Sequence, residues 1–155
     1  MLQRIQTVYL LFVAGLFIAL LFLPLAVVKS GNTEYSFNVF GLNTVAPPYE
    51  LVFSTWPLLF LTAVISILSL IIIFMYKKRI LQMRISVFNS LLIIGLCCMF
   101  GFYFWQFKKS PELPDMILNI KVWTAFPIVS LIFNYLAIRS IGIDEALVRS
   151  LNRLR

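Results

Sequence analysis

Four long apolar runs, separated by short polar segments, make up most of the sequence. They cover residues 7–28, 55–76, 85–107 and 117–138, and Lys121 is the only charged residue inside them. A helix needs about 20 apolar residues to cross the roughly 30 Å hydrocarbon core of a membrane. The pattern therefore predicts four membrane-spanning helices. The first is expected to be a retained span, because a cleaved signal peptide has an apolar region of only about 7–15 residues.

Local signals mark the ends and the interior of these runs. Ser54 and Thr55 stand just before Pro57, and a Ser or Thr cap followed by proline in the first turn is typical of a helix start. The basic residues 77–79 are expected to end this second helix. Pro127 lies inside the fourth run and predicts a kink there, because proline removes one helix hydrogen bond.

The segment between the first two runs, residues 29–53, carries a strand pattern. Residues 30–33 have the composition of a turn, and apolar and polar residues then alternate from 35 to 39. This alternation has the period of a half-buried strand. We expect a short β-hairpin that lies over the outer ends of the helices and ends at Gly41.

Residues 139–155 are expected to form a unit separate from the transmembrane domain of residues 1–138. Gly142 is a plausible stop for the fourth helix, and Asp144 and Glu145 suit the first turn of a new one. Apolar residues then continue at helical spacing, at Ile143, Leu147, Leu151 and Leu154. The pattern predicts an amphipathic tail helix that lies on an anionic membrane surface or docks onto a partner.

Composition supports the membrane assignment. The chain is 61% hydrophobic and only 12% charged, whereas an average soluble domain is about 25% charged. Its 15% aromatic content argues against disorder. The net charge of +7 does not indicate nucleic-acid binding, because the basic residues lie between the apolar runs, where membrane topology accounts for them.

The distribution of Lys and Arg predicts the orientation. Nine of them lie in the N-terminus, the loop at 77–84 and the tail, and four lie on the other side, in the two remaining loops and at the start of the fourth run. Cytoplasmic loops of membrane proteins are enriched in Lys and Arg, so both termini are expected in the cytoplasm.

The sequence contains few groups that could carry chemistry. It has no histidine, and its two cysteines, Cys97 and Cys98, are adjacent within an apolar run rather than spaced as metal ligands. The central parts of the spans carry no ionisable residue, and no catalytic motif occurs. We therefore expect no catalytic activity, no cofactor and no metal site.

Helix-packing signals remain. Small residues four apart allow two helices to approach closely, and hydroxyl groups can bond across helices. Both kinds of signal occur in the first three spans, and we expect packing roles for Gly15, Ala19, Thr62, Ser66, Ser69, Cys97 and Gly101. They serve packing inside one four-helix bundle or the docking of a separate membrane protein.

Three segments on the expected cytoplasmic side, which we call the basic rim, are the most distinctive. Residues 1–7 (MLQRIQT), 76–84 (YKKRILQMR) and 144–150 (DEALVRS) resemble a family of small four-span inner-membrane proteins of Bacteroidota, a domain of unknown function. The resemblance spans essentially the whole chain and implies a Gram-negative inner membrane, with the outer loops in the periplasm, but no particular activity. The four-span plan with a strand in the first outer loop is also similar to that of claudin-like proteins, although their outer-loop motif is missing.

We therefore expect an all-α integral membrane protein: a four-transmembrane-helix bundle with a short periplasmic β-hairpin and a C-terminal cytoplasmic amphipathic helix. The favoured function is a non-catalytic accessory or scaffold subunit of a larger inner-membrane complex, in contact with membrane lipids and an integral membrane partner. Its partner or lipid contacts are expected at the basic rim, at Gln3, Arg4, Gln82, Arg84, Asp144, Glu145, Arg149 and Arg153. Two alternatives stay open. A small transporter or channel would use a cavity lined by Thr62, Ser66, Ser69, Asn89 or Asn134, and a lipid-binding protein would use the basic rim.

Overall fold

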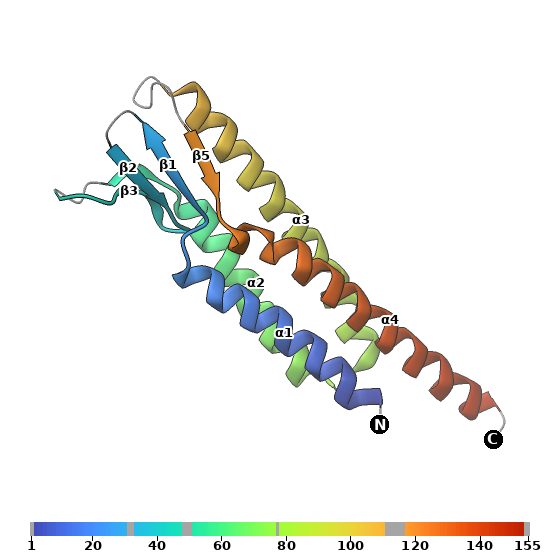
Figure 1. The fold of residues 1–155 in the computed structure, drawn as a ribbon. Coiled ribbons are helices and arrows are strands. Elements are labelled where there is room, and N and C mark those ends of the chain that lie inside the picture. Colours follow the sequence, from blue (N-terminus) through green and yellow to red (C-terminus); the bar gives the residue numbers. More distant parts are fainter. Residues whose placement is uncertain (1, 31–32, 48–50, 77, 111–116, 154–155) are drawn as a thin grey trace.

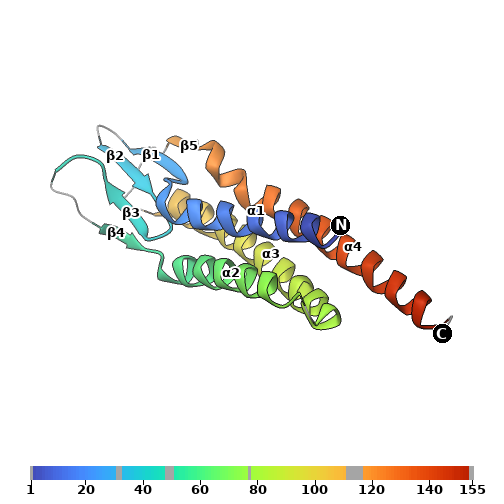
Figure 2. The ribbon, with the colours of Figure 1, turned by 90° about the horizontal axis from the view of Figure 1, so that it is seen from below.

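A computed structural model describes residues 2–30, 33–47, 51–76, 78–110 and 117–153. Four long helices lie side by side, and a β-sheet covers one end of them (Figure 1). Seen from below, both chain termini lie at the end away from the sheet (Figure 2). We call these the sheet end and the basic end. The helices are α1 (Leu2–Phe22), α2 (Trp56–Phe74), α3 (Arg79–Lys109) and α4 (Phe126–Arg153).

All four helices are long and apolar enough to cross a membrane. The three tryptophans lie where these helices meet the sheet end. Trp56 is the first residue of α2, Trp105 lies near the end of α3, and Trp123 lies in the 3₁₀-helix η1 (Val122–Ala125) that leads into α4. Tryptophan favours the headgroup level of a membrane, so these residues mark one boundary of the apolar bundle.

The helices pack through a regular buried seam. On each helix the buried residues recur at alternating intervals of three and four, the spacing of antiparallel helix bundles with a small crossing angle. Apolar and polar residues share these seams. The positions are Gln6, Leu10, Val13, Phe17 and Leu20 on α1; Leu58, Thr62, Ile65, Ser69 and Ile72 on α2; Gln82, Ser86, Asn89, Ile93, Leu96 and Phe100 on α3; and Pro127, Ser130, Asn134, Ala137, Ile141 and Asp144 on α4.

The sheet is antiparallel and has five strands. In chain order these are β1 (Ala26–Ser30), β2 (Thr33–Phe37), β3 (Gly41–Thr44), β4 (Leu51–Ser54) and β5 (Ile117–Ile120). Their order across the sheet is β4-β3-β2-β1-β5. The last strand comes from the connection between α3 and α4, so both outer connections build one sheet.

The expected all-α bundle with only a short hairpin is therefore wrong. The hairpin exists as β1 and β2, but it forms the middle of a larger sheet. Residues 26–28 and 117–120, which hydropathy assigns to the first and fourth spans, are the paired strands β1 and β5. Helix α1 ends before Pro24, and the β-branched Val27 and Val28 that follow favour a strand.

Aromatic residues join the sheet to the bundle. The inner face of β2 presents the fully buried Phe37, whose ring meets Phe104 and Phe107 of α3 edge to face at centroid distances of 5.7 and 5.0 Å. Thr55, just before α2, donates a hydrogen bond from its hydroxyl to the Val39 carbonyl at 2.9 Å. These contacts fix the sheet directly on the helix ends.

The structure also corrects two expectations about α4. Pro127 is the second residue of the helix, where no N–H is needed, so it starts α4 instead of kinking its interior. Gly142 does not end the helix. It lies within an unbroken α4 that continues to Arg153, so residues 139–153 extend the fourth helix and form no separate tail helix.

Candidate functional site

A layer of polar side chains crosses the interior of the bundle. We call Ser69, Ser86, Asn89, Ser90 and Asn134 the polar layer. Asn89 donates from Nδ2 to the Ser69 hydroxyl at 3.1 Å, which links α3 to α2. Asn134 donates from Nδ2 to the Ser86 carbonyl at 2.9 Å and to the Ser90 hydroxyl at 2.7 Å, which links α4 to α3. Both asparagines are fully buried.

The polar layer separates two apolar clusters. On α2, Ser69 lies between Ile65 of the larger cluster and Ile72 of the smaller one. On α3, Asn89 lies between Ile93 of the larger cluster and Ile85, which packs against the smaller one. The layer therefore interrupts the apolar core part of the way along the bundle.

Three oxygen atoms near this level have no hydrogen-bond partner among the residues described. They are the side-chain carbonyls of Asn89 and Asn134 and the hydroxyl of Ser130, one helical turn from Asn134. All three residues are fully buried. A buried polar atom without a partner costs about 1–3 kcal/mol, so the polar layer is able to accept hydrogen bonds from a small donor such as water.

The hydroxyl groups expected to bond across helices bond mainly within α2. Thr62, Ser66 and Ser69 are buried, and each donates to the carbonyl four residues earlier, at 2.7–2.9 Å. Of the three, Ser69 also accepts a bond from another helix. The small-residue pairs face away from the core: Gly15 and Gly101 are exposed, and Ala19 and Cys97 are half-buried.

Two glutamines join the helices at the basic end. Gln6 of α1 donates from Nε2 to the Asp144 carboxylate of α4 at 2.5 Å, and Asp144 is 8% exposed. Gln82 of α3 is also buried and donates to the Ile72 carbonyl of α2 at 3.1 Å. Gln82 and Asp144 are thus buried in contacts that hold the helices together here.

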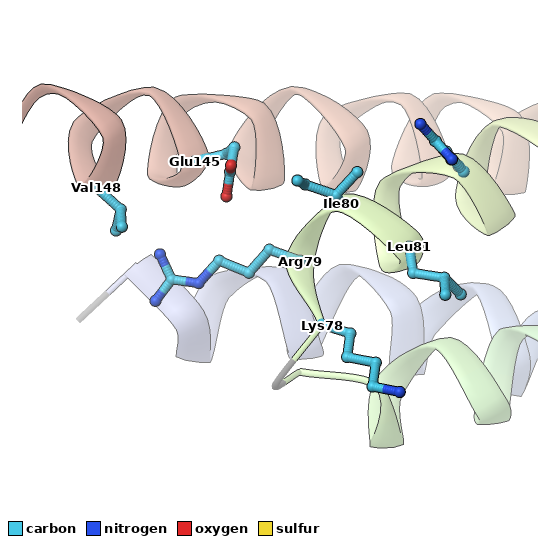
Figure 3. A pocket seen from close by; sticks show the side chains of 7 residues that line it. Lys78, Arg79, Ile80, Leu81, Glu145 and Val148 are labelled. Atoms are coloured by element: carbon cyan, nitrogen blue, oxygen red, sulfur yellow. The ribbon is translucent and has the colours of Figure 1, made fainter. Parts of the chain in front are cut away.

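A cavity of about 540 Å³ lies beside these contacts, between the start of α3 and α4 (Figure 3). Glu145 and Val148 project from α4 toward the side chain of Arg79, which extends from the start of α3 (Figure 3). Arg79 donates to the Asp144 backbone carbonyl at 3.4 Å. The lining residues are Lys78, Arg79, Ile80, Leu81, Arg84, Glu145 and Val148.

Of the expected rim contacts, the structure brings Arg84 and Glu145 to this cavity. The side chains of Gln3, Arg4, Arg149 and Arg153 lie outside the described residues.

The sequence model of one family, described as a domain of unknown function (DUF4293), matches residues 2–154. The chain belongs to the DUF4293 family. The match runs through all four helices and all five strands, so the arrangement above is that of one DUF4293 domain. A search of curated proteins gives no match.

Sequence reasoning missed several contacts of this DUF4293 domain. Hydropathy does not single out Gln6 and Ser130. Both are polar residues at buried seam positions of α1 and α4, where an apolar residue is the usual expectation. Their spacing was the available signal: Gln6 is four residues before Leu10, and Ser130 is four before Asn134. Arg79 was expected in a loop, but it is the first residue of α3.

Proposed function

We propose that this protein is a non-catalytic accessory subunit of a larger bacterial inner-membrane complex. The observation that carries the proposal is the end of α4. Both ribbon views show α4 continuing past the other three helices (Figures 1 and 2). Its apolar residues Ile143 and Leu147, one turn apart, are 47% and 51% exposed there.

We call residues 145–153 the α4 extension, and Ile143 and Leu147 the apolar stripe. The direction of the extension determines what can cover this stripe. Asp144 lies level with Gln6 of α1 and Arg79 of α3, and from there to Arg153 the helix continues for about 14 Å. A tail hinged at Gly142 could lie flat on a membrane. A straight continuation of a spanning helix points away from the membrane instead, which leaves its apolar stripe in water without a partner.

Charge indicates the kind of partner. Residues 139–155 contain four arginines and two acidic residues, and the adjoining start of α3 adds Lys78, Arg79 and Arg84. By the positive-inside rule we assign this end to the cytoplasm. The partner that fits is an amphipathic helix from a cytoplasmic segment of another subunit, with an apolar stripe flanked by Asp and Glu.

A crosslinking experiment in native membranes tests this proposal. A photoreactive amino acid replaces Ser150, which is exposed on the α4 extension. We expect one reproducible crosslinked protein at near-stoichiometric yield. Leu147→Asp should reduce this product at least about tenfold, because a carboxylate on the apolar stripe costs about 1.4 kcal/mol or more in the interface.

Ala146→Asp is the matched control, since it adds the same charge to the same helical turn at an exposed position off the stripe. It should leave the crosslink unchanged. If Ser150 crosslinks only to lipid, or if both aspartate variants act alike, the α4 extension is not a docking helix and the subunit proposal loses its basis.

A further inference from the structure

We propose that the cavity at the start of α3 binds the phosphate group of an anionic phospholipid from the cytoplasmic leaflet. This ligand is separate from the protein partner proposed for the α4 extension. The inference rests on the charge of the cavity lining, on its depth relative to the apolar spans, and on the apolar residues at its rim.

The lining has an excess of positive charge. Lys78, Arg79 and Arg84 face one carboxylate, that of Glu145. The side chains of Lys78 and Arg84 make no hydrogen bond or ion pair within the described part of the chain, and both residues are exposed. Arg79 contributes one N–H to the Asp144 backbone, which leaves the other guanidinium donors available.

The neighbouring acid does not neutralise these cations. The Asp144 carboxylate is buried and accepts its hydrogen bond from Gln6, on the α1 side. Among the described residues, Arg79 donates a hydrogen bond to the backbone carbonyl of Asp144 and not to its carboxylate. The cavity therefore keeps cations that can form charge-assisted hydrogen bonds with the oxygens of a phosphate.

The cavity lies at the depth of lipid headgroups. The long uncharged part of α3 begins at Ile85, next to Arg84, and Arg79 lies about 9 Å further along the helix axis. The headgroup layer occupies about 5–8 Å on each side of the hydrocarbon core. Arg84 and Arg79 thus bracket the level at which phosphates lie when α3 spans the membrane.

Apolar residues next to the cations favour a lipid over a peptide carboxylate or a free anion. Ile80 and Leu81 line the cavity and are 43% and 42% exposed. A lipid whose phosphate meets the cations can lay the start of its acyl chains over these two side chains. Basic pockets between helix ends on the cytoplasmic side are suited to anionic headgroups for this reason.

Lipid titration of the purified full-length protein in a neutral detergent tests the inference. Phosphatidylglycerol should raise the midpoint of thermal unfolding, and equal amounts of phosphatidylcholine or inorganic phosphate should not. Lys78→Gln with Arg84→Gln should weaken phosphatidylglycerol binding by about 30-fold, since each basic residue near a membrane surface contributes a factor of about five. Neither side chain holds the fold together, so the unfolding midpoint without lipid should stay unchanged.

The control is Lys108→Gln with Lys121→Gln, which removes the same charge from exposed positions at the sheet end. It should bind phosphatidylglycerol like the unmodified protein. Equal loss in both double variants would mean a general charge effect and would overturn the site. Equal stabilisation by inorganic phosphate or by phosphatidylcholine would overturn the lipid assignment.

A second measurement needs no variant. Native mass spectrometry of the unmodified protein, released from mixed micelles, should retain phosphatidylglycerol in preference to phosphatidylcholine. Absence of this preference contradicts the proposal even if a variant fails to fold. Leu147 does not line the cavity, so loss of lipid binding and loss of the partner crosslink can be told apart.

Discussion

At the scale of single residues, the polar layer has a fixed pattern of donors and acceptors. The hydroxyls of Ser69 and Ser90 donate to carbonyls of their own helices, so each can only accept from an asparagine. This requires that Asn89 and Asn134 turn their N–H groups toward the serines. Their side-chain carbonyls are then left as surplus acceptors in an apolar setting.

Two substitutions at Asn134 distinguish the stabilisation from its hydrogen bonds from the cost of burying its unpaired side-chain carbonyl. Asn134→Ala should lower the free energy of unfolding by about 1–2 kcal/mol, because it removes two interhelical hydrogen bonds and leaves a small void. Asn134→Leu removes the same bonds together with the unpaired carbonyl and refills the space, so it should stay within about 1 kcal/mol of the unmodified protein.

Reversible unfolding in detergent measures both changes. Asn119→Ala is the control, because it deletes an asparagine amide at an exposed position of β5. A larger loss for Asn134→Leu than for Asn134→Ala would mean that the carbonyl has a bound partner, such as an ordered water, whose removal is costly.

The sequence pattern identifies these polar residues but does not predict which atoms they bond to. Asn89, Asn134 and the α2 hydroxyls stand out as polar residues within apolar runs. Which atoms they bond to depends on how four helices are aligned, and hydropathy does not encode that alignment. Gln6 and Asp144 illustrate the difficulty, since they are 138 residues apart and each looks like part of a solvated terminus in the sequence.

At the scale of secondary structure, the prolines and glycines of the sequence differ in how well they mark helix ends. Pro57 marks the start of α2, as a proline in the first turn should. Gly142 is a residue type that often ends a helix, yet it lies inside α4. Residues 117–120 are apolar enough to belong to a span, and only pairing with a strand about 90 positions earlier makes them β5.

Gly142→Ala tests the continuity of α4. In a continuous helix alanine is favoured over glycine by about 0.8–1.0 kcal/mol, and a Cβ here would meet the Met83 sulfur at an ordinary contact distance of 3.9 Å. We therefore expect the free energy of unfolding to rise by up to about 1 kcal/mol. If Gly142 instead ended the helix in a left-handed conformation, the alanine would destabilise the protein, because such a conformation disfavours a side chain.

At the scale of the whole molecule, the two ends differ in structure and in charge. The sheet end carries the five-stranded sheet, in which Lys29 forms an ion pair with Glu34, and its basic and acidic residues are balanced in number. The basic end carries the cavity, whose lining has an excess of positive charge, and the α4 extension. Both proposed binding surfaces therefore lie at the end that the positive-inside rule assigns to the cytoplasm.

This orientation can be measured with single cysteines in a Cys97→Ala, Cys98→Ala background. Val45→Cys places a thiol at an exposed position beside β3, and Ser150→Cys places one on the α4 extension. A membrane-impermeant maleimide applied to spheroplasts should label the thiol at position 45 and reach the one at position 150 only after lysis. The reverse pattern would place the basic cavity and the α4 extension outside the cytoplasm. The lipid of the cytoplasmic leaflet and a cytoplasmic partner helix would then both be impossible, so this one measurement bears on both proposals while leaving the fold itself unaffected.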